Sequence, residues 1–302
     1  MEVAAGTTTS SRYDRHSDAH VEECIAPSVT LLGVADGFGA VGRNVPTAQS
    51  ALAAVRDYLR RRHRVGSYSR NVSPNHLRGI LLAALEHANA RLYAESGSHE
   101  DYVGSGTSLT AVLVVGEHAL VGHVGDARAY ILRLGALEKL TVDDAMFSGA
   151  AVTSSSKHLP ANPRSRGLLW RTLGTQAKLE ASVAHVDVRQ GDQLVLCTDG
   201  VHRFLDDEEI GDALLESENC ADAVTRVLAT AKARGMMDNG TLIVCRDLLR
   251  SASVVMARAP RLAVRTIVAI GLLVVALLSF GSYALRTGSF DRFPNVSNSD
   301  RP

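Results

Sequence analysis

The chain has 302 residues, of which 46% are hydrophobic and 21% are charged, a composition typical of a globular protein. Its 32 basic and 32 acidic residues give a formal net charge of zero, so no overall positive field favours a nucleic-acid partner. The four cysteines share no C-x-x-C spacing, which disfavours a zinc site or a redox pair built from them.

The N-terminal residues 1–11 are small and polar, and we expect them to be disordered. They lack a basic segment followed by an apolar core, so the sequence predicts no cleavable signal peptide. The folded domain is expected over residues 12–250.

The first part of this domain predicts one strand followed by two helices. Residues 29–35, VTLLGVA, form a continuous apolar run typical of a buried strand. A helix is predicted over 46–62, where Pro46 suits the first turn, and another over 75–95, where apolar residues recur at helical spacing.

The second part predicts a run of strands, a pair of helices and a closing strand. The expected elements are strands at 108–115, 119–124 and 129–134, a hairpin within 187–198, helices at 206–217 and 221–233, and a strand at 241–246. Runs of strands and paired helices favour an α+β fold over an alternating parallel sheet. Two antiparallel sheets flanked by helix pairs satisfy the pattern.

Residues 266–285 form an uncharged, mostly apolar run bracketed by Arg265 and Arg286. At about 1.5 Å per residue, a helix of this length spans about 30 Å, the thickness of a bilayer's hydrocarbon core. We therefore expect a single transmembrane helix, preceded by a linker at 251–265 and followed by a short polar tail at 286–302. Arginines are more frequent before the run than after it, which predicts a membrane protein with its large N-terminal part in the cytoplasm.

Four aspartates adjoin the ends of predicted core strands: Asp36, Asp126, Asp199 and Asp238. A single Asp-Gly after a strand is usually only a turn former. If the strands are neighbours, however, four carboxylates converge at one rim and repel one another unless cations neutralise them. Oxygen ligands of this kind select Mg²⁺ or Mn²⁺.

Five segments around these positions occur in a fixed order. They read VADGFGAVG, GSGTSLTAVLVVGEHALVGHVGDARAYIL, LEKLTVDD, CTDGV and DNGTLIV. They are similar, in that order, to A-D-G-x-G-G, G-T-T followed by V-G-D-S-R-A-Y, L-T-x-D-H, T-D-G-L and D-N-x-T-x-[IV]. These are motifs of the metal-dependent Ser/Thr protein phosphatases of the PPM, or type 2C, family. The resemblance covers roughly Asp18 to Asp247.

The resemblance implies a four-layer αββα sandwich with a two-metal centre of Mn²⁺ or Mg²⁺ at one edge. It implies that Asp36 bridges both ions, that the Gly37 carbonyl binds one, and that Asp199 and Asp238 ligate the other. These three aspartates then carry the catalysis, in which an activated water attacks the phosphorus of a phosphoserine or phosphothreonine.

Two further aspartates match positions of the same family. Asp18, in RHSDAH, matches an early aspartate that holds metal-bound water, and Asp126 matches a ligand of the third ion of many bacterial members.

The sequence departs from the family's early motif, R-x-x-N-[EQ]-D. Tyr13 stands at the phosphate-binding arginine and Ser17 precedes the aspartate. Arg12 and Arg15 lie beside Tyr13, and either they contact phosphate or they are ordinary solvated charges. Phe38 stands where eukaryotic members carry a general-acid histidine.

Three functional hypotheses stay open. The first is a phosphatase acting on phosphoproteins at the cytoplasmic face of a membrane, with a receptor-type Ser/Thr kinase as a candidate partner. The second is a catalytically inactive PPM-fold module with a regulatory or binding role, and the third is a small-molecule phosphatase. The segment 146–166, rich in Ser, Gly and Pro, lies where the family carries a flap, and it either selects substrates or is inert.

Overall fold

The computed structural model describes residues 1–9, 17–39, 46–64, 72–98, 102–144 and 169–248, all within one compact unit, Met1–Ser251. The predictions for Arg12, Arg15, the segment 146–166 and the apolar run 266–285 lie outside the described residues. Among the residues that are described, no helix has the length and apolar character needed to cross a membrane.

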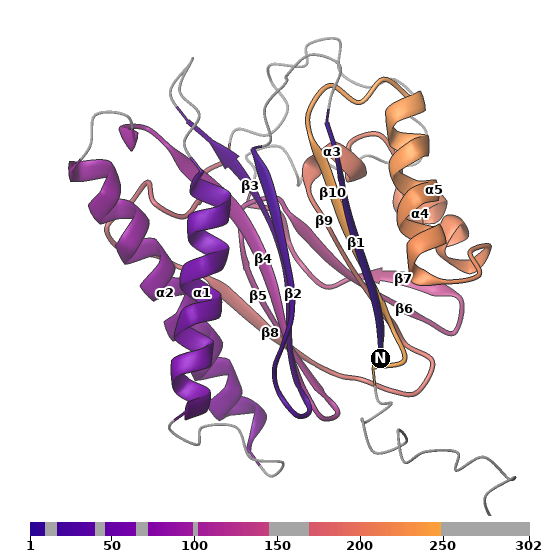
Figure 1. The fold of residues 1–302 in the computed structure, drawn as a ribbon, viewed down its shortest axis with the longest axis horizontal. Helices are drawn as coiled ribbons and strands as arrows, with labels where there is room; N and C mark the ends of the chain where they lie inside the picture. The colour runs from indigo at the N-terminus through magenta and orange to yellow at the C-terminus, as the bar shows by residue number, and fades with distance from the viewer. Residues whose placement is uncertain (10–16, 40–45, 65–71, 99–101, 145–168, 249–302) are drawn as a thin grey trace, which may run out of the picture. The chain divides into compact units, whose positions relative to one another are not determined.

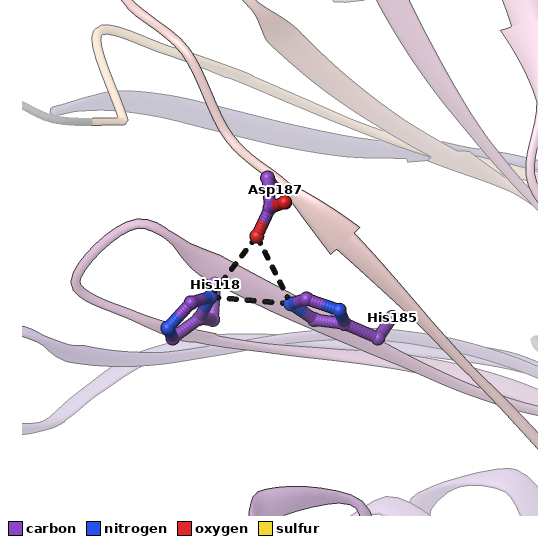
Figure 2. A group of neighbouring side chains, drawn as sticks. All are labelled: His118, His185 and Asp187. Atoms are coloured by element: carbon purple, nitrogen blue, oxygen red, sulfur yellow. Dashed lines mark hydrogen bonds and ion pairs between the residues drawn. The ribbon is translucent and has the colours of Figure 1, made fainter. Parts of the chain in front are cut away.

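Two five-stranded antiparallel sheets form the centre of this unit (Figure 1). Sheet I has the order β1 (Glu2–Thr8), β10 (Gly240–Arg246), β9 (Gln193–Cys197), β6 (Arg128–Arg133) and β7 (Ala136–Lys139). Sheet II has the order β2 (Asp18–Ala26), β3 (Val29–Phe38), β4 (Gly106–Val115), β5 (His118–Val124) and β8 (Ser182–Asp187). At the edge of sheet II, His118 of β5 lies opposite Asp187 of β8 (Figure 2).

The continuous apolar run of β3 follows from its burial on both faces. Leu31 and Ala35 pack into the cluster beneath α1 and α2, whereas Leu32 and Val34 pack into the cluster between the two sheets. Successive side chains of a strand point to opposite faces, so a strand with helices on one side and a second sheet on the other is apolar at every position.

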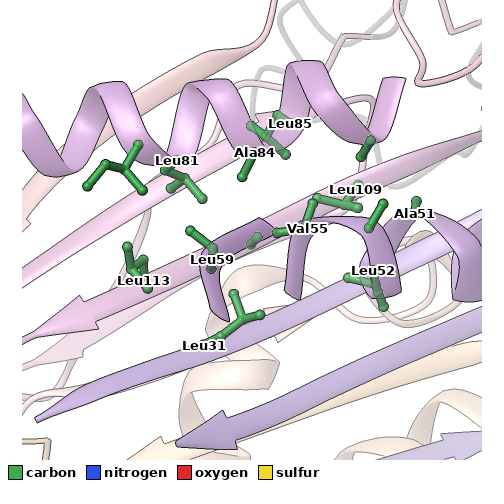
Figure 3. Packing of buried hydrophobic residues seen from close by; sticks show 14 of the residues in the cluster. Leu31, Ala51, Leu52, Val55, Leu59, Leu81, Ala84, Leu85, Leu109 and Leu113 are labelled. Carbon is green, nitrogen blue, oxygen red and sulfur yellow. The ribbon is translucent and has the colours of Figure 1, made fainter. Parts of the chain in front are cut away.

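Helix pairs cover the outer faces of the two sheets. The helices α1 (Thr47–Arg64) and α2 (Pro74–Ser98) pack on sheet II, and Figure 3 shows their buried side chains meeting those of β3 and β4. A fully buried leucine in this cluster contributes about 1.5–3 kcal/mol through the hydrophobic effect.

The helices of the other side are α3 (Asp199–His202), α4 (Asp207–Leu215) and α5 (Cys220–Ala233), and they pack against sheet I. Helix α4 begins with a capping box, in which the Asp206 side chain accepts from the Glu209 backbone and the Glu209 side chain accepts from the Asp206 backbone.

The predicted α+β architecture of two antiparallel sheets between helix pairs is confirmed for this unit. Two local predictions were wrong. Residues 2–8 are not disordered, because β1 pairs with β10 along its full length. Residues 187–198 do not form a hairpin, because β8 belongs to sheet II and β9 to sheet I, with Val188 buried between the sheets.

Candidate metal centre

Four of the predicted aspartates come together where the two sheets meet. Asp18 begins β2 and lies directly opposite Asp36 of β3 in sheet II. Asp199 follows β9 and Asp238 precedes β10, which are neighbouring strands of sheet I. The charges of Asp18, Asp199 and Asp238 all act on Asp36. Strand pairing therefore brings together carboxylates that are far apart in the sequence.

Asp18 is held by the strands of the opposite sheet. The Thr198 hydroxyl donates to its Oδ2 at 2.7 Å and accepts from the Thr241 backbone N–H at 2.9 Å. Burial raises the pKa of Asp18 to about 6, an effect that the Thr198 hydrogen bond opposes. Thr198 thus fixes Asp18 relative to β9 and β10.

Asp36 is affected by the charges of all three other aspartates. Its backbone carbonyl accepts from the Thr107 hydroxyl at 2.8 Å, and Asp36 faces Asp18 across the paired strands. Burial is the main reason that the pKa of Asp36 is raised well above its usual value. The negative charges of Asp199, Asp18 and Asp238 raise this pKa further. Like charges held this close favour a shared proton or a bound cation.

Asp199 is the first residue of α3, and Arg203 one turn later pairs with it at 2.6 Å. Burial raises the pKa of Asp199 to about 8, and the charges of Asp126 and Asp238 add to this, whereas Arg203 opposes it. One guanidinium therefore does not compensate the burial of this carboxylate.

Two glycines permit the close approach of the backbones at this rim. A Cβ on Gly200 would lie 1.9 Å from the carbonyl oxygen of Asn239, so only glycine lets Asp199 and Asp238 sit side by side. A Cβ on Gly37 would lie 2.5 Å from the Thr47 hydroxyl. The Gly37 N–H donates to the Ser17 carbonyl at 3.1 Å, which joins the two strands of sheet II beside Asp36.

Ser17 departs from the family's usual acidic or amide residue, yet it has a defined partner. The buried Asn239 side chain donates to its hydroxyl at 3.1 Å. The Asn239 backbone N–H also donates to Oδ1 of Asp238 at 2.8 Å. Asn239 thus connects Ser17 with the aspartate beside it.

Asp126 lies next to this group and is paired with Arg203 at 3.0 Å. Burial raises the pKa of Asp126, although Arg203 opposes the shift. The Arg203 guanidinium bridges Asp126 and Asp199, and Asp126 is where the sequence predicted a third ion.

His202 donates from Nε2 to the Asp126 carbonyl at 2.9 Å, and burial lowers the pKa of His202 to about 3. It is therefore a neutral structural histidine.

The group fits divalent cations. Oδ1 of Asp18 and Oδ1 of Asp199 are both buried, and within the described part of the chain neither has a hydrogen-bond partner. Buried oxygens of ionised carboxylates are costly without a donor or a cation. An all-oxygen set with raised pKa values is suited to Mg²⁺ or Mn²⁺.

A second set of carboxylates, in the LTVDD segment, is neutralised within the protein. Arg128 contacts Asp143 through both Nε and Nη2, with Nη2 to Oδ2 at 2.7 Å. Asp144 accepts from the Gly125 N–H at 3.0 Å and pairs with Arg171. Burial alone would raise the pKa of Asp143, but the hydrogen bonds and charge of Arg128, together with the charge of Lys139, outweigh burial and lower the pKa.

The sequence profile of the family described as protein phosphatase 2C matches residues 5–240. The chain belongs to this family. It is 30% identical over 253 residues to the serine/threonine protein phosphatase PstP of Mycobacterium tuberculosis, covering 80% of this chain and 46% of that protein. It is 31% identical over 161 residues to the serine/threonine phosphatase stp of Listeria welshimeri, covering 53% of this chain and 63% of that protein. The chain thus spans about half to two thirds of the length of these relatives.

Solved structures of the family share the fold. The crystal structure of M. tuberculosis PstP has 26% sequence identity and a TM-score of 0.66, covering 81% of this chain and 97% of that one. The PPM Ser-Thr phosphatase MsPP of Mycobacterium smegmatis, solved with cacodylate, has 28% identity and a TM-score of 0.66, covering 82% and 98%. The catalytic domain of PstP was solved with two manganese ions, with 26% identity and a TM-score of 0.65, covering 81% of this chain and 97% of that one.

Most of the predicted ligands are thus neighbours in space, but several of their supports were not predicted. Thr198 reaches Asp18 from the opposite sheet, Asn239 binds both its neighbour Asp238 and the distant Ser17, and Arg203 pairs with Asp199 one helical turn earlier. Thr198 and Asn239 lie in the CTDGV and DNGTLIV segments, and Arg203 stands four residues after Asp199, but none of these positions indicated the contacts that the side chains make.

Proposed function

We propose that this protein is a metal-dependent phosphatase that hydrolyses phosphoserine and phosphothreonine in proteins. The observation that carries the proposal is the group of Asp18, Asp36, Asp199 and Asp238, whose charges oppose one another at one rim. Family membership and the two manganese ions of the PstP catalytic domain support it.

Asp36, Asp199 and Asp238 would hold two Mn²⁺ or Mg²⁺ ions together with the Gly37 carbonyl, and Asp18 would orient water beside them. When bound, such ions lower the pKa of an attacking water and neutralise charge on the phosphoryl oxygens. The remaining work falls to the protein. Thr198 and Asn239 keep the carboxylates in position before substrate arrives, which limits reorganisation during the reaction.

Neither His202 nor His123 supplies a general acid to the centre. His202 is neutral and bonded to a backbone carbonyl, and buried His123 contacts the Thr110 hydroxyl and the Val142 carbonyl. Phe38, which ends β3, is 41% exposed and offers an apolar surface next to the aspartates. We therefore propose that solvent water protonates the leaving alkoxide.

An inactive regulatory module is a weaker alternative. A module that only binds a partner does not need several buried carboxylates that destabilise one another. The burial of Asp199, with an oxygen that lacks a partner among the described residues, favours a functional centre.

The test is hydrolysis of a phosphothreonine peptide by the full chain, with Mn²⁺ or with chelator. We expect Asp36→Asn to lower metal-dependent turnover by about a thousandfold, a loss of about 4 kcal/mol of transition-state stabilisation. Asp57→Asn is the matched control, because Asp57 is a partly exposed aspartate of α1 that pairs with Arg56. A metal-loaded wild-type protein without turnover would support the inactive module instead.

We also propose that the apolar run 266–285 anchors the protein in a membrane, with the phosphatase domain in the cytoplasm and phosphoproteins near the membrane, including a Ser/Thr kinase, as substrates. The uncharged length of the run and the excess of arginines before it support this. Membrane fractionation after a high-salt wash, compared with a variant carrying two arginines within the run, tests the anchor. If the high-salt wash released the wild type and the two-arginine variant from the membrane to the same extent, the membrane anchor would be rejected.

A further inference from the structure

Away from the aspartates, His118, His185 and Asp187 form a compact group at the edge of sheet II (Figure 2). Nδ1 of His118 lies 3.2 Å from Oδ1 of Asp187, and Nε2 of His185 lies 3.3 Å from the same oxygen. The two ring nitrogens are 3.1 Å apart. Among the described residues, this is the one group of histidine, cysteine and acidic side chains whose three ligand atoms all lie within 4.8 Å of one another.

The strand register explains the grouping. His118 is paired with Asp187, and His185 is paired with Leu120 two residues further along β5. Residues two apart on a strand share a face, so all three side chains lie on the face that also carries Leu120. They are partly or fully exposed, which leaves the group open to an ion from solvent.

Protons alone cannot satisfy this triangle. Each ring nitrogen carries at most one hydrogen, and an ionised carboxylate carries none. If both nitrogens are protonated, two N–H groups face each other across the 3.1 Å side, and if one is protonated, the other presents a lone pair to Asp187. If neither is protonated, three lone pairs point at one another. With Asp187 ionised, one side of the triangle is therefore unfavourable in each of these states.

A single cation at the centre satisfies all three atoms. A tetrahedral ion with ligand bonds of about 2.0–2.1 Å has ligand atoms about 3.3 Å apart, which is close to the three observed separations. Two imidazoles and one carboxylate suit Zn²⁺ and related transition metals rather than Mg²⁺ or Mn²⁺. Within the described part of the chain, the Asp187 carboxylate forms ion pairs only with these two histidines.

We propose that His118, His185 and Asp187 bind a transition-metal ion of the Zn²⁺ class at a site separate from the aspartate centre. The ion links β8, an edge strand, to β5 and keeps a coordination position for water. Because it binds the folded state, it stabilises the fold. Phosphatase turnover does not require it.

The test is Zn²⁺ binding to the full chain by titration calorimetry, with Mg²⁺ in excess to occupy the aspartate centre. We expect one Zn²⁺ site, a higher Tm with Zn²⁺, and affinity lowered by about a hundredfold or more in His118→Ala and in His185→Ala, because each loses a direct ligand. His76→Ala, which removes an exposed histidine of α2, should bind as the wild type does.

Two further variants separate this site from the catalytic one. Asp199→Asn should keep the Zn²⁺ site, and His118→Cys should retain binding, because a thiolate also ligates Zn²⁺. Unchanged Mn²⁺-dependent hydrolysis by His118→Ala and His185→Ala would show that these variants are folded. Equal Zn²⁺ affinity in all histidine variants, loss of the site only in Asp199→Asn, or no binding by the wild type would each overturn the proposal.

Discussion

Two groups of buried aspartates in this domain differ in their partners. In the metal centre, Asp18 and Asp199 have raised pKa values and oxygens without a hydrogen-bond partner among the described residues. In the LTVDD segment, Asp143 and Asp144 each pair with an arginine of their own, and the pKa of Asp143 is lowered. A buried carboxylate with its own cation is structural, whereas a group that lacks enough cations is prepared to bind them from solvent.

The largest contrast is expected in the stability of the metal-free protein. Asp143→Asn should lower the free energy of unfolding by about 3–5 kcal/mol, because Arg128 loses the carboxylate that it contacts at 2.7 Å and keeps only the more distant Asp207 at 3.7 Å. Asp199→Asn should leave the free energy of unfolding unchanged or raise it, because the variant removes a negative charge that burial disfavours. Urea unfolding in chelator measures both, and similar losses in the two variants would remove the distinction between the groups.

A second contrast concerns the backbone that brings the aspartates together. Gly200→Ala should destabilise the protein by about 3 kcal/mol and lower turnover, because the new Cβ would overlap the Asn239 carbonyl. Gly79→Ala is the matched control, since Gly79 is exposed in α2 with nothing near its Cβ, and should stabilise by about 0.5–1 kcal/mol. Thermal unfolding and peptide hydrolysis are the measurements, and a folded, fully active Gly200→Ala would contradict the assigned role of this contact.

The sequence predicted the ligands better than their supports. Asp36, Asp126, Asp199 and Asp238 were recognisable because each adjoins an apolar strand, and the antiparallel sheets with paired helices followed from the order of elements. Thr198 belongs to the CTDGV segment, but its contact was not recognisable, because its hydroxyl reaches Asp18, 180 residues away in the sequence.

Two other features escaped the sequence for similar reasons. The turn at Gly191–Asp192 has the chemistry of a hairpin, but the choice between sheets for β8 and β9 depends on long-range pairing. The histidines of the proposed zinc site are 67 residues apart, so no local spacing marks them, and only the β5–β8 register brings them together.

The third contrast is the response of the two groups to pH. The pKa values of Asp18 and Asp199, about 6 and about 8 in the folded protein, exceed the ordinary value of 3.8. The metal-free folded state thus retains protons that the unfolded chain has lost, and its stability falls as the pH rises from about 4 through these two values. Asp143 acts in the opposite direction, because its lowered pKa contributes stability that is lost in acid.

Mn²⁺ must displace the protons held by Asp18 and Asp199, so its stabilising effect should grow between about pH 6 and about pH 8. Each displaced proton contributes about 1.4 kcal/mol per pH unit. The Tm with Mn²⁺ and with chelator, measured at both pH values, tests this. A smaller pH dependence is expected in Asp199→Asn, and an Mn²⁺-induced shift that is equal at both pH values in the wild type would rule out proton displacement.

The smallest effect is expected at Arg203, which among the described residues is the cation that pairs with aspartates of the metal centre. Its guanidinium bridges Asp126 and Asp199 and repels any ion that binds nearby. Arg203→Ala should lower the Mn²⁺ concentration for half-maximal activity several-fold, about 1 kcal/mol, whereas Arg203→Lys should stay close to the wild type.

Arg203→Ala also tests the third ion predicted at Asp126, because loss of the guanidinium frees the carboxylates of Asp126 and Asp199. An additional Mn²⁺ equivalent in Arg203→Ala, measured by calorimetry, would mean that the arginine replaces this ion. Weaker Mn²⁺ binding in that variant would instead show that Arg203 mainly holds Asp199 in place.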